Sequence, residues 1–319
     1  DRSGTLTLAA NTHDLLIRFL SALPLGDRPR LVTTDGEFHT IRRQLERLEE
    51  EGLDVVRISS EDPLSLSERL AGAVDDRTAA VLVSTVLFGS GRIVPGLERA
   101  LGAAQRHGAE LLLDTYHQLA AVPFAIDESG LGAAFAVGGG YKYCQLGEGN
   151  CFLRVPPDRD LRPVVTGWFA EFEDLHEAPP GGVAYGAGAA AFAGATYDPT
   201  SHYRGAAVFD FFDAHSLDGQ FLRQVSQHQV GRLAARFDAL DLPPSTVSRP
   251  TVPLEELGAF LTLYSPRASE LSDGLRERGV STDVRGDQLR FGPAPYLCDR
   301  QLDDAVAALG EVVRGIEDR

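Results

Sequence analysis

The first half of the chain alternates short apolar segments with amphipathic ones, and this alternation limits the possible folds more than any other feature. The amphipathic segments include His39–Glu51 and Leu97–His107, which are typical of helices with one apolar face. Strands that alternate with helices usually pair in parallel, and the helices then cover both faces of the sheet. We therefore predict an α/β fold with a largely parallel sheet. The expected strands are Leu6–Ala10, Arg30–Thr34, Leu53–Ile58, Ala79–Val86, Glu110–Asp114, Phe135–Val137 and Cys151–Val155.

The pattern changes in the second half, which predicts a smaller α+β domain at the C-terminus. We assign residues 1–204 to a large domain, 205–240 to a connecting helix and 241–319 to the small domain. Residues 181–196 are rich in Gly and Ala, and they suit either a linker or an ordered active-site loop. The chain begins at Asp1 and contains no methionine, so we expect part of the N-terminal region of the large domain to be missing.

Charge and composition exclude several classes of partner. The formal net charge of −16 argues against a nucleic-acid or anionic-membrane surface, because both would repel the protein. No apolar stretch approaches the ~20 residues that span a bilayer, and no signal peptide is visible. The three cysteines form no CxxC pair or disulfide framework, and the eight histidines stand at no metal-ligand spacing. We expect a cytoplasmic protein without a metal site.

Lys142 is the only lysine among 30 lysines and arginines, in the segment Gly138-Gly139-Gly140-Tyr141-Lys142-Tyr143. An arginine can carry a surface charge or an ion pair as well as a lysine can, but its guanidinium stays protonated near neutral pH. A primary amine, in contrast, can form a Schiff base with a carbonyl such as that of pyridoxal phosphate. Lys142 is therefore a candidate catalytic amine, and the alternative is a surface lysine retained by chance.

Asp114 ends the apolar run Leu111-Leu112-Leu113, and ligands of open α/β sheets bind at the carboxyl ends of strands. A buried carboxylate at that place can keep the ring nitrogen of pyridoxal phosphate protonated, which makes the ring a better electron sink. An aspartate at a strand end is also a common helix cap. The combination of Asp114, His117 and Lys142 favours the functional interpretation.

Three motifs surround the candidate lysine, and weaker ones extend over nearly the whole chain. The three are Asp114-Thr-Tyr-His117, Ala121-Val-Pro123 and Phe135-Ala-Val-Gly-Gly-Gly-Tyr-Lys142-Tyr, and the weaker ones are Glu37-Phe38, Ser90-Gly91-Arg92, Gly167-Trp168-Phe169, Thr196 and Leu289-Arg290-Phe291-Gly292. Together they resemble the kynureninases, which belong to the class V aminotransferase group of fold-type I pyridoxal-phosphate enzymes. The resemblance implies a homodimer that acts on a small amino-acid substrate.

The resemblance also implies roles for individual residues. Lys142 would be the Schiff-base lysine, Asp114 would face the pyridinium nitrogen, and His117 would lie beside it. Phe38 would stack on the ring, because an aromatic side chain offers a flat apolar face. The remaining implied contacts are Tyr141, Thr12, His13 and Trp168 with the phosphate, Thr196 with the site from a neighbouring subunit, and Arg290 with the substrate carboxylate.

Each of these roles has a structural alternative. Phe38 and Trp168 could be ordinary core aromatics, and Thr12 could be the N-cap of the helix that follows it. Arg290 could pair with Asp283 or Asp287 instead of a substrate. Cys298 follows a strand of the small domain, and we interpret it as structural.

The chain departs from the kynureninases at Ile41, where the family carries an acid, at Ala170-Glu171 and in the residues after Thr196. We expect these positions to lie towards the substrate, so the cofactor assignment stands and the substrate is predicted to differ from kynurenine. The resemblance implies hydrolytic C–C cleavage of a γ-keto amino acid. The alternatives are a class V aminotransferase, a β-eliminating lyase or an epimerase, and a non-catalytic binding protein that kept the fold.

Overall fold

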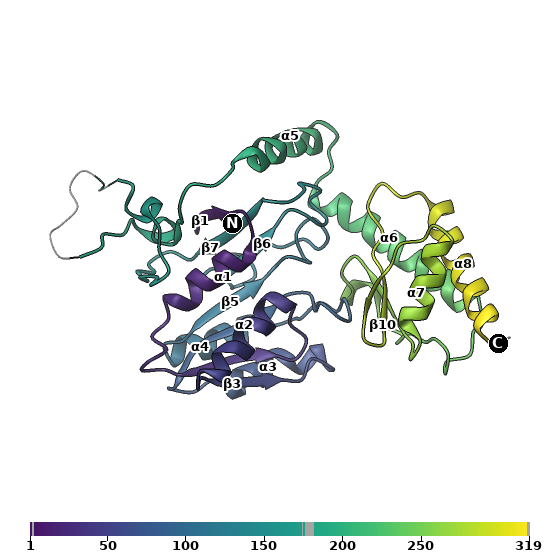
Figure 1. The fold of residues 1–319 in the computed structure, drawn as a ribbon, viewed down its shortest axis with the longest axis horizontal. Helices are drawn as coiled ribbons and strands as arrows, with labels where there is room; N and C mark the ends of the chain where they lie inside the picture. Colours follow the sequence, from purple (N-terminus) through teal and green to yellow (C-terminus); the bar gives the residue numbers. More distant parts are fainter. Residues whose placement is uncertain (2, 174, 176–181, 318–319) are drawn as a thin grey trace. The chain divides into compact units, whose positions relative to one another are not determined.

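The computed structural model describes residues 1, 3–173, 175 and 182–317. They form two compact units (Figure 1). The first consists of Asp1–Thr85, Val94–Leu119 and Phe124–His215, and the second of Val86–Ile93, Ala120–Pro123 and Ser216–Arg319. The second unit therefore takes two short segments from the first half of the chain, in addition to the C-terminal residues that the sequence assigned to a small domain.

The first unit is built on a seven-stranded sheet that contains every strand expected from the sequence. Its spatial order is β1-β7-β6-β5-β4-β2-β3. Strands β2 to β6 pair in parallel, and β7 is antiparallel to both β6 and β1. This arrangement confirms the predicted mostly parallel sheet. The strands are β1 (Thr5–Ala9), β2 (Arg30–Thr34), β3 (Asp54–Ile58), β4 (Thr78–Ser84), β5 (Glu110–Asp114), β6 (Phe135–Gly139) and β7 (Cys151–Val155).

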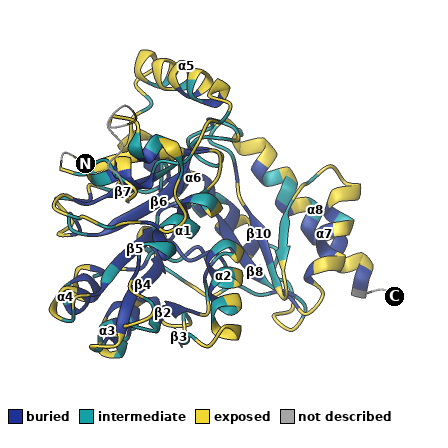
Figure 2. Cartoon of the chain, turned by 60° about the vertical axis from the view of Figure 1, so that its left-hand side comes forward, coloured by how far each residue is buried: buried dark blue, intermediate teal, exposed yellow. Residues whose placement is uncertain are grey.

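Helices connect the strands from β1 to β5 in sequence and bury their apolar faces on the sheet (Figure 2). All seven residues of β4 are buried, as expected for a central strand that is covered on both faces. Phe135 of β6 is fully buried, and its ring centroid lies 5.0 Å from that of Phe19 and 5.9 Å from that of Phe192. The helices are α1 (Thr12–Ser21), α2 (His39–Glu50), α3 (Pro63–Ala73) and α4 (Glu98–Arg106).

After β7 the chain crosses the first unit in short 3-10 turns, η1 (Trp168–Glu171) and η2 (Gly188–Phe192), and then enters α5 (Thr200–Ala214). The described part of the Gly/Ala-rich segment is ordered, because η2 packs on β1 and the Ala189 N–H donates to Thr5 Oγ1 (3.0 Å). A segment with small side chains can approach a strand closely. In α5 only Ser201 and Gly205 are buried.

The second unit contains a three-stranded antiparallel sheet, order β8-β10-β9, with helices packed on it. Where the sequence predicts one connecting helix over residues 205–240, the structure has α5 and α6 (Gly219–Asp238). Ser216 interrupts them with a positive φ of 54°, and the Asp218 side chain caps α6 by accepting the Phe221 N–H. The other elements are η3 (Leu254–Glu256), β8 (Leu261–Tyr264), α7 (Ala268–Glu277), β9 (Asp283–Arg285), β10 (Gln288–Phe291) and α8 (Asp299–Glu317).

In the described part of the chain, every helix is too short or too polar to cross a bilayer.

The aromatic cluster around Phe135 generates a stability prediction. Phe135→Ala should lower the free energy of unfolding by about 3–5 kcal/mol, because it removes a fully buried ring and leaves a cavity. Tyr296→Ala is the matched control, since Tyr296 is 76% exposed, and it should change stability by less than about 0.5 kcal/mol. Urea unfolding followed by circular dichroism measures both values. Equal, small losses in the two variants would contradict this description of the core.

Candidate active site

The parallel register brings three strand ends together in the first unit. Ser84 at the end of β4 pairs with Asp114 at the end of β5, and Asp114 pairs with Val137 of β6. Lys142 follows β6 by three residues. Because carboxyl ends of parallel strands lie at one edge of the sheet, Asp114 and Lys142 share that edge, as ligand-binding residues of open α/β sheets do.

The Asp114 carboxylate lies at this edge in a half-buried position. The Tyr116 backbone N–H donates to Asp114 Oδ1 (2.9 Å). Burial raises the pKa of Asp114 above its ordinary value, while the Tyr116 N–H and the Lys142 charge oppose the shift. Asp114 is therefore a carboxylate that would gain from a further cationic partner.

Lys142 Nζ is hydrogen-bonded to His117 Nε2. An ammonium group has only donors, so when Lys142 is protonated His117 accepts with Nε2 and carries its own proton on Nδ1. Lys142 Nζ also lies 5.9 Å from the centroid of the Phe38 ring and 5.8 Å from that of the Tyr116 ring. Four residues singled out in the sequence, Lys142, Asp114, His117 and Phe38, thus come together.

Tyr116 is part of this group, although the sequence analysis did not select it. Its hydroxyl is hydrogen-bonded to the Cys151 thiol and to the Tyr141 backbone, and burial raises its pKa. A Cβ on Gly139 would lie 2.6 Å from the Tyr116 ring and 2.7 Å from Cys151 Sγ, so only glycine fits there. The sequence feature that could have identified Tyr116 is its position within the Asp114-Thr-Tyr-His117 motif.

Glu37 is the second residue whose individual role the sequence analysis missed. Its side chain is 5% exposed and accepts from Thr34 Oγ1 (2.6 Å), Ser84 N (3.1 Å) and Ser84 Oγ (2.5 Å). Burial is the main cause that raises the pKa of Glu37 to about 7, and the Asp114 charge adds to it. A buried carboxyl at a strand edge beside Phe38 was visible only as part of the Glu37-Phe38 motif.

The start of α1 contacts Cys151, which is in turn hydrogen-bonded to Tyr116 of the same group. The N-cap is Asn11, whose side chain accepts the Asp14 N–H (2.9 Å), so the alternative interpretation of Thr12 as N-cap is wrong. The Thr12 backbone is hydrogen-bonded to the Cys151 thiol, and the His13 side chain is exposed. Thr12 and His13 therefore begin a helix whose N-terminal dipole favours an anion.

The other residues implied to contact the phosphate or to reach the site are exposed. Tyr141 is 53% exposed and Trp168 45% exposed, and Thr196 lies on the exposed loop between η2 and α5. The Trp168 ring packs on Phe169 (4.3 Å between centroids) and Phe172 (5.6 Å). Trp168 thus belongs to a second, surface aromatic group rather than to the core.

Arg290 lies on β10 of the second unit and is nearly buried. Its guanidinium pairs with Asp283 and donates to the Phe88 carbonyl, and it stacks over the rings of Phe88 (4.3 Å) and Phe260 (5.1 Å). The structure therefore contains the Asp283 pair that was the alternative to substrate binding. Arg290 Nε is buried without a hydrogen-bond partner among the described residues.

Ile41 does not support the expected difference at the substrate end. Its side chain is 2% exposed and packs with Leu45 in the core of the first unit, because α2 turns this face towards the sheet. Ala170 is likewise buried in η1. Both side chains are therefore buried within the first unit.

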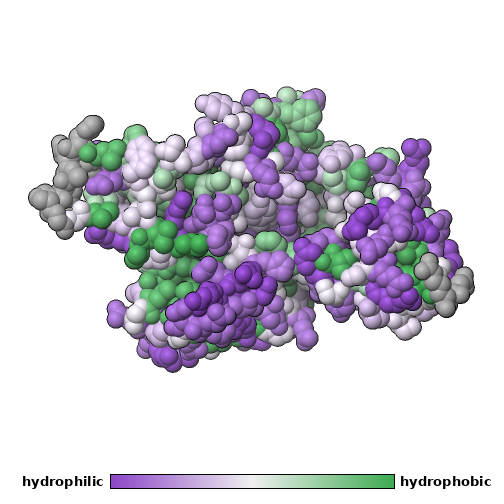
Figure 3. All heavy atoms as spheres, viewed as in Figure 1, coloured by the Kyte–Doolittle hydropathy of each residue, from purple (hydrophilic) through white to green (hydrophobic). Residues whose placement is uncertain are grey.

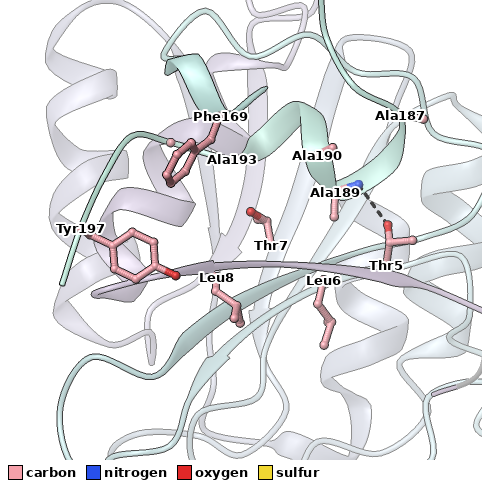
Figure 4. A pocket seen from close by; sticks show the side chains of 11 residues that line it. Thr5, Leu6, Thr7, Leu8, Phe169, Ala187, Ala189, Ala190, Ala193 and Tyr197 are labelled. Atoms are coloured by element: carbon pink, nitrogen blue, oxygen red, sulfur yellow. Dashed lines mark hydrogen bonds between the residues drawn. The ribbon is translucent and has the colours of Figure 1, made fainter. Parts of the chain in front are cut away.

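A cavity of about 460 Å³ lies elsewhere in the first unit, between β1 and the η1–η2 segment (Figure 4). Leu6 and Leu8 point from β1 away from η2, whereas Thr7 points towards it. The lining of this cavity also includes Phe169 and Tyr197 but none of the candidate site residues. The cavity is therefore separate from the Lys142 group.

Comparisons with known proteins add a sequence relative and a fold. No family model matches the chain. A curated kynureninase of Deinococcus radiodurans is 28% identical over 269 residues, which cover 78% of this chain and 64% of that protein. The chain thus spans less than two thirds of the length of this relative. The match confirms the resemblance that the motifs indicated.

Several solved structures share the fold over 97% of this chain. The C–S lyase C-DES, in a form with glycine covalently linked to its PLP cofactor, has a TM-score of 0.79 with 14% identity and 80% of its chain covered. A cysteine desulfurase of Escherichia coli has a TM-score of 0.77 with 15% identity and 79% covered. A cysteine desulfurase of Thermococcus onnurineus has a TM-score of 0.76 with 16% identity and 79% covered. These likenesses confirm the predicted fold-type I architecture.

Proposed function

We propose that the chain is a pyridoxal-phosphate-dependent enzyme that acts on an amino acid and uses Lys142 as its amine. The observation that carries the proposal is the position of the only lysine, hydrogen-bonded to His117 at the strand edge that also holds Asp114. A binding module has no need of an amine nucleophile at that place.

The residues present fit this cofactor. Lys142 would supply the amine that reacts with the aldehyde of the cofactor. The buried Asp114 carboxylate would supply the anionic partner of the protonated ring nitrogen. Phe38 and Tyr116 offer flat apolar faces near the amine. The N-terminus of α1 at Thr12 and His13, together with Tyr141 and Trp168, would hold the phosphate.

When bound, the cofactor supplies an electron sink for a carbanion at the substrate α-carbon. The residues of the chain do the remaining work. Lys142 would move the proton at the α-carbon, and His117 would hold the amine in place through Nε2. The exposed hydroxyl of Tyr141 would serve as a general acid or base for a water that attacks the γ-carbonyl.

Hydrolytic C–C cleavage of a γ-keto amino acid is the reaction we favour, because a curated relative that is 28% identical in sequence is a kynureninase. The alternatives remain transamination, epimerisation and β-elimination, of which β-elimination gains weight from the C–S lyase fold match. Arg290 would bind the substrate carboxylate with its guanidinium, in exchange for part of its contact with Asp283. A non-catalytic binding protein is the second alternative.

We also propose that the protein is a homodimer with shared active sites, in which Thr196 of one copy reaches the other. Helix α5 supports this proposal, since Tyr203, Phe209 and Phe211 are 77%, 51% and 54% exposed. Apolar atoms are visible over α5 in Figure 3. Exposed aromatic residues on one helix are typical of an interface.

The cofactor assignment predicts that the pure protein, loaded with pyridoxal phosphate, absorbs visible light and that borohydride fixes the cofactor on Lys142. Mass spectrometry of the digested protein locates the modified peptide. Lys142→Arg should keep the urea-unfolding midpoint but lose the absorbance, because a guanidinium forms no stable linkage with the aldehyde. A protein that stays colourless with added cofactor would refute the assignment.

A product analysis tests the reaction. With a panel of γ-keto and β-substituted amino acids, we expect alanine and an acid as products, and kynurenine to be slower than the best substrate. Cys298→Ser should leave the rate unchanged, since the proposed chemistry uses no thiol. Cys298 is a free, exposed cysteine, so the substitution is compatible with folding. Sulfide released from cysteine by the wild type but not by Cys298→Ser would instead indicate desulfurase chemistry.

The dimer proposal predicts that the wild type has a molar mass of twice the chain mass, as measured by light scattering after size-exclusion chromatography. The double substitution Phe209→Glu and Phe211→Glu should give monomers, because it places charges on the proposed interface. Tyr296→Glu is the control, since Tyr296 is 76% exposed but lies in the second unit. A monomeric wild type would contradict the proposal.

A further inference from the structure

Glu37 is a buried acid that the proposed chemistry does not use. It follows β2 and binds the end of β4, because it accepts from Thr34 at the end of β2 and twice from Ser84 at the end of β4. It directly precedes Phe38, so these bonds also fix the backbone that holds the Phe38 ring near the Lys142 amine. Glu37 is thus in a position to influence the site without touching a substrate.

The surroundings of Glu37 and Asp114 differ in charge. Asp114 faces the Lys142 ammonium, whose charge favours the carboxylate. The interactions of Glu37 with described residues are with hydroxyls and one backbone N–H. Ser84, which binds Glu37, pairs in register with Asp114, so the charged group that acts on Glu37 is a like charge on the neighbouring strand end. Two nearby carboxyls in a buried place do not both ionise easily, and the lysine charge favours ionisation of Asp114 over Glu37.

The hydrogen bonds of Glu37 accommodate both protonation states. A serine hydroxyl can donate or accept. Ser84 Oγ therefore donates to Glu37 Oε2 when the carboxyl is ionised, and accepts from it when the carboxyl is protonated. The proton can enter and leave while all three bonds to Glu37 remain, so no side chain has to move.

We propose that Glu37 and Asp114 form a coupled acid pair that holds one proton near neutral pH, with the proton on Glu37. In this role Glu37 is a positioning residue, since its neutral form leaves Asp114 as the ionised partner for the cofactor ring nitrogen. Only this last step rests on the proposed function. The coupling itself is a property of the protein without cofactor.

The first experiment measures urea unfolding of the cofactor-free protein between pH 5 and 8. Folding raises the pKa of Glu37 from 4.5 to about 7, so the folded state binds more protons in that range and loses stability as the pH rises. Glu37→Gln resembles the protonated acid, so its free energy of unfolding should lack this loss. The difference in free energy of unfolding between Glu37→Gln and the wild type should therefore grow up to about pH 7 and then level off. Parallel profiles of the two proteins would overturn the proposal.

Two further variants separate coupling from packing. Asp114→Asn removes the like charge, so the midpoint of the Glu37-dependent loss should move to lower pH; an unmoved midpoint would refute the coupling. Thr34→Val removes a hydrogen bond that stabilises the ionised carboxyl of Glu37 but leaves the like charge in place, so it should lower stability and move the midpoint to higher pH, opposite to Asp114→Asn. If Glu37→Gln does not fold, infrared difference spectra of the wild type between pH 6 and 8 test the same point. They should show loss of a protonated-carboxyl band, and absence of that band would refute the proposal.

The second experiment adds pyridoxal phosphate to the cofactor-free protein in calorimeter buffers of different ionisation enthalpy at pH 7. A cation beside Asp114 should favour ionised Glu37, so the wild type should release more protons on binding than Glu37→Gln does. Equal proton release would refute the link between Glu37 and the cofactor site. Absence of binding, together with the predicted pH profiles, would refute the proposed function and leave the acid pair intact.

Discussion

The parallel pairing of β4, β5 and β6 is the interaction on which the candidate site depends. It sets Ser84, Asp114 and the segment after Gly139 at one sheet edge, although they are far apart in the sequence. A shift of one residue in this register would turn Asp114 to the opposite face of the sheet. The close contact of Gly139 with Tyr116 then fixes the distance between the chain segments that carry Asp114 and Lys142.

Burial gives this edge its chemical character. Two carboxyls, Glu37 and Asp114, lie close enough to interact, and in a less polar surrounding their charges interact more strongly than in water. Burial raises the pKa of both acids, and the neighbours differ: a cation near Asp114 opposes the effect of burial, while at Glu37 only hydrogen bonds oppose it. The site therefore differentiates two chemically similar acids by their partners.

The sequence predicted the sheet and the central residues well because both leave local signals. Apolar runs bounded by turns predict strands, and a lone lysine among arginines is visible without a fold. Tyr116 and Glu37 were not selected, because their roles depend on partners that are distant in the sequence. Tyr116 is hydrogen-bonded to Cys151, and Glu37 is hydrogen-bonded to Ser84. The burial of Ile41 was not predicted either, since a difference from related proteins does not reveal which way a side chain points. The interruption of the helix at Ser216 was also not predicted, because the helical sequence pattern continues on both sides of this residue.

The order in which the sheet is assembled follows from the pairing of β1 with β7. Thr5 pairs with Val155, 150 positions later, whereas β2 to β6 find their partners within much shorter stretches of chain. Closing so long a loop costs more entropy, and during synthesis β1 can pair with β7 only after residues 151–155 are made. Strand β1 is therefore incorporated after the strands β2 to β6 that follow it in the sequence, and the anchoring of η2 on Thr5 comes later still.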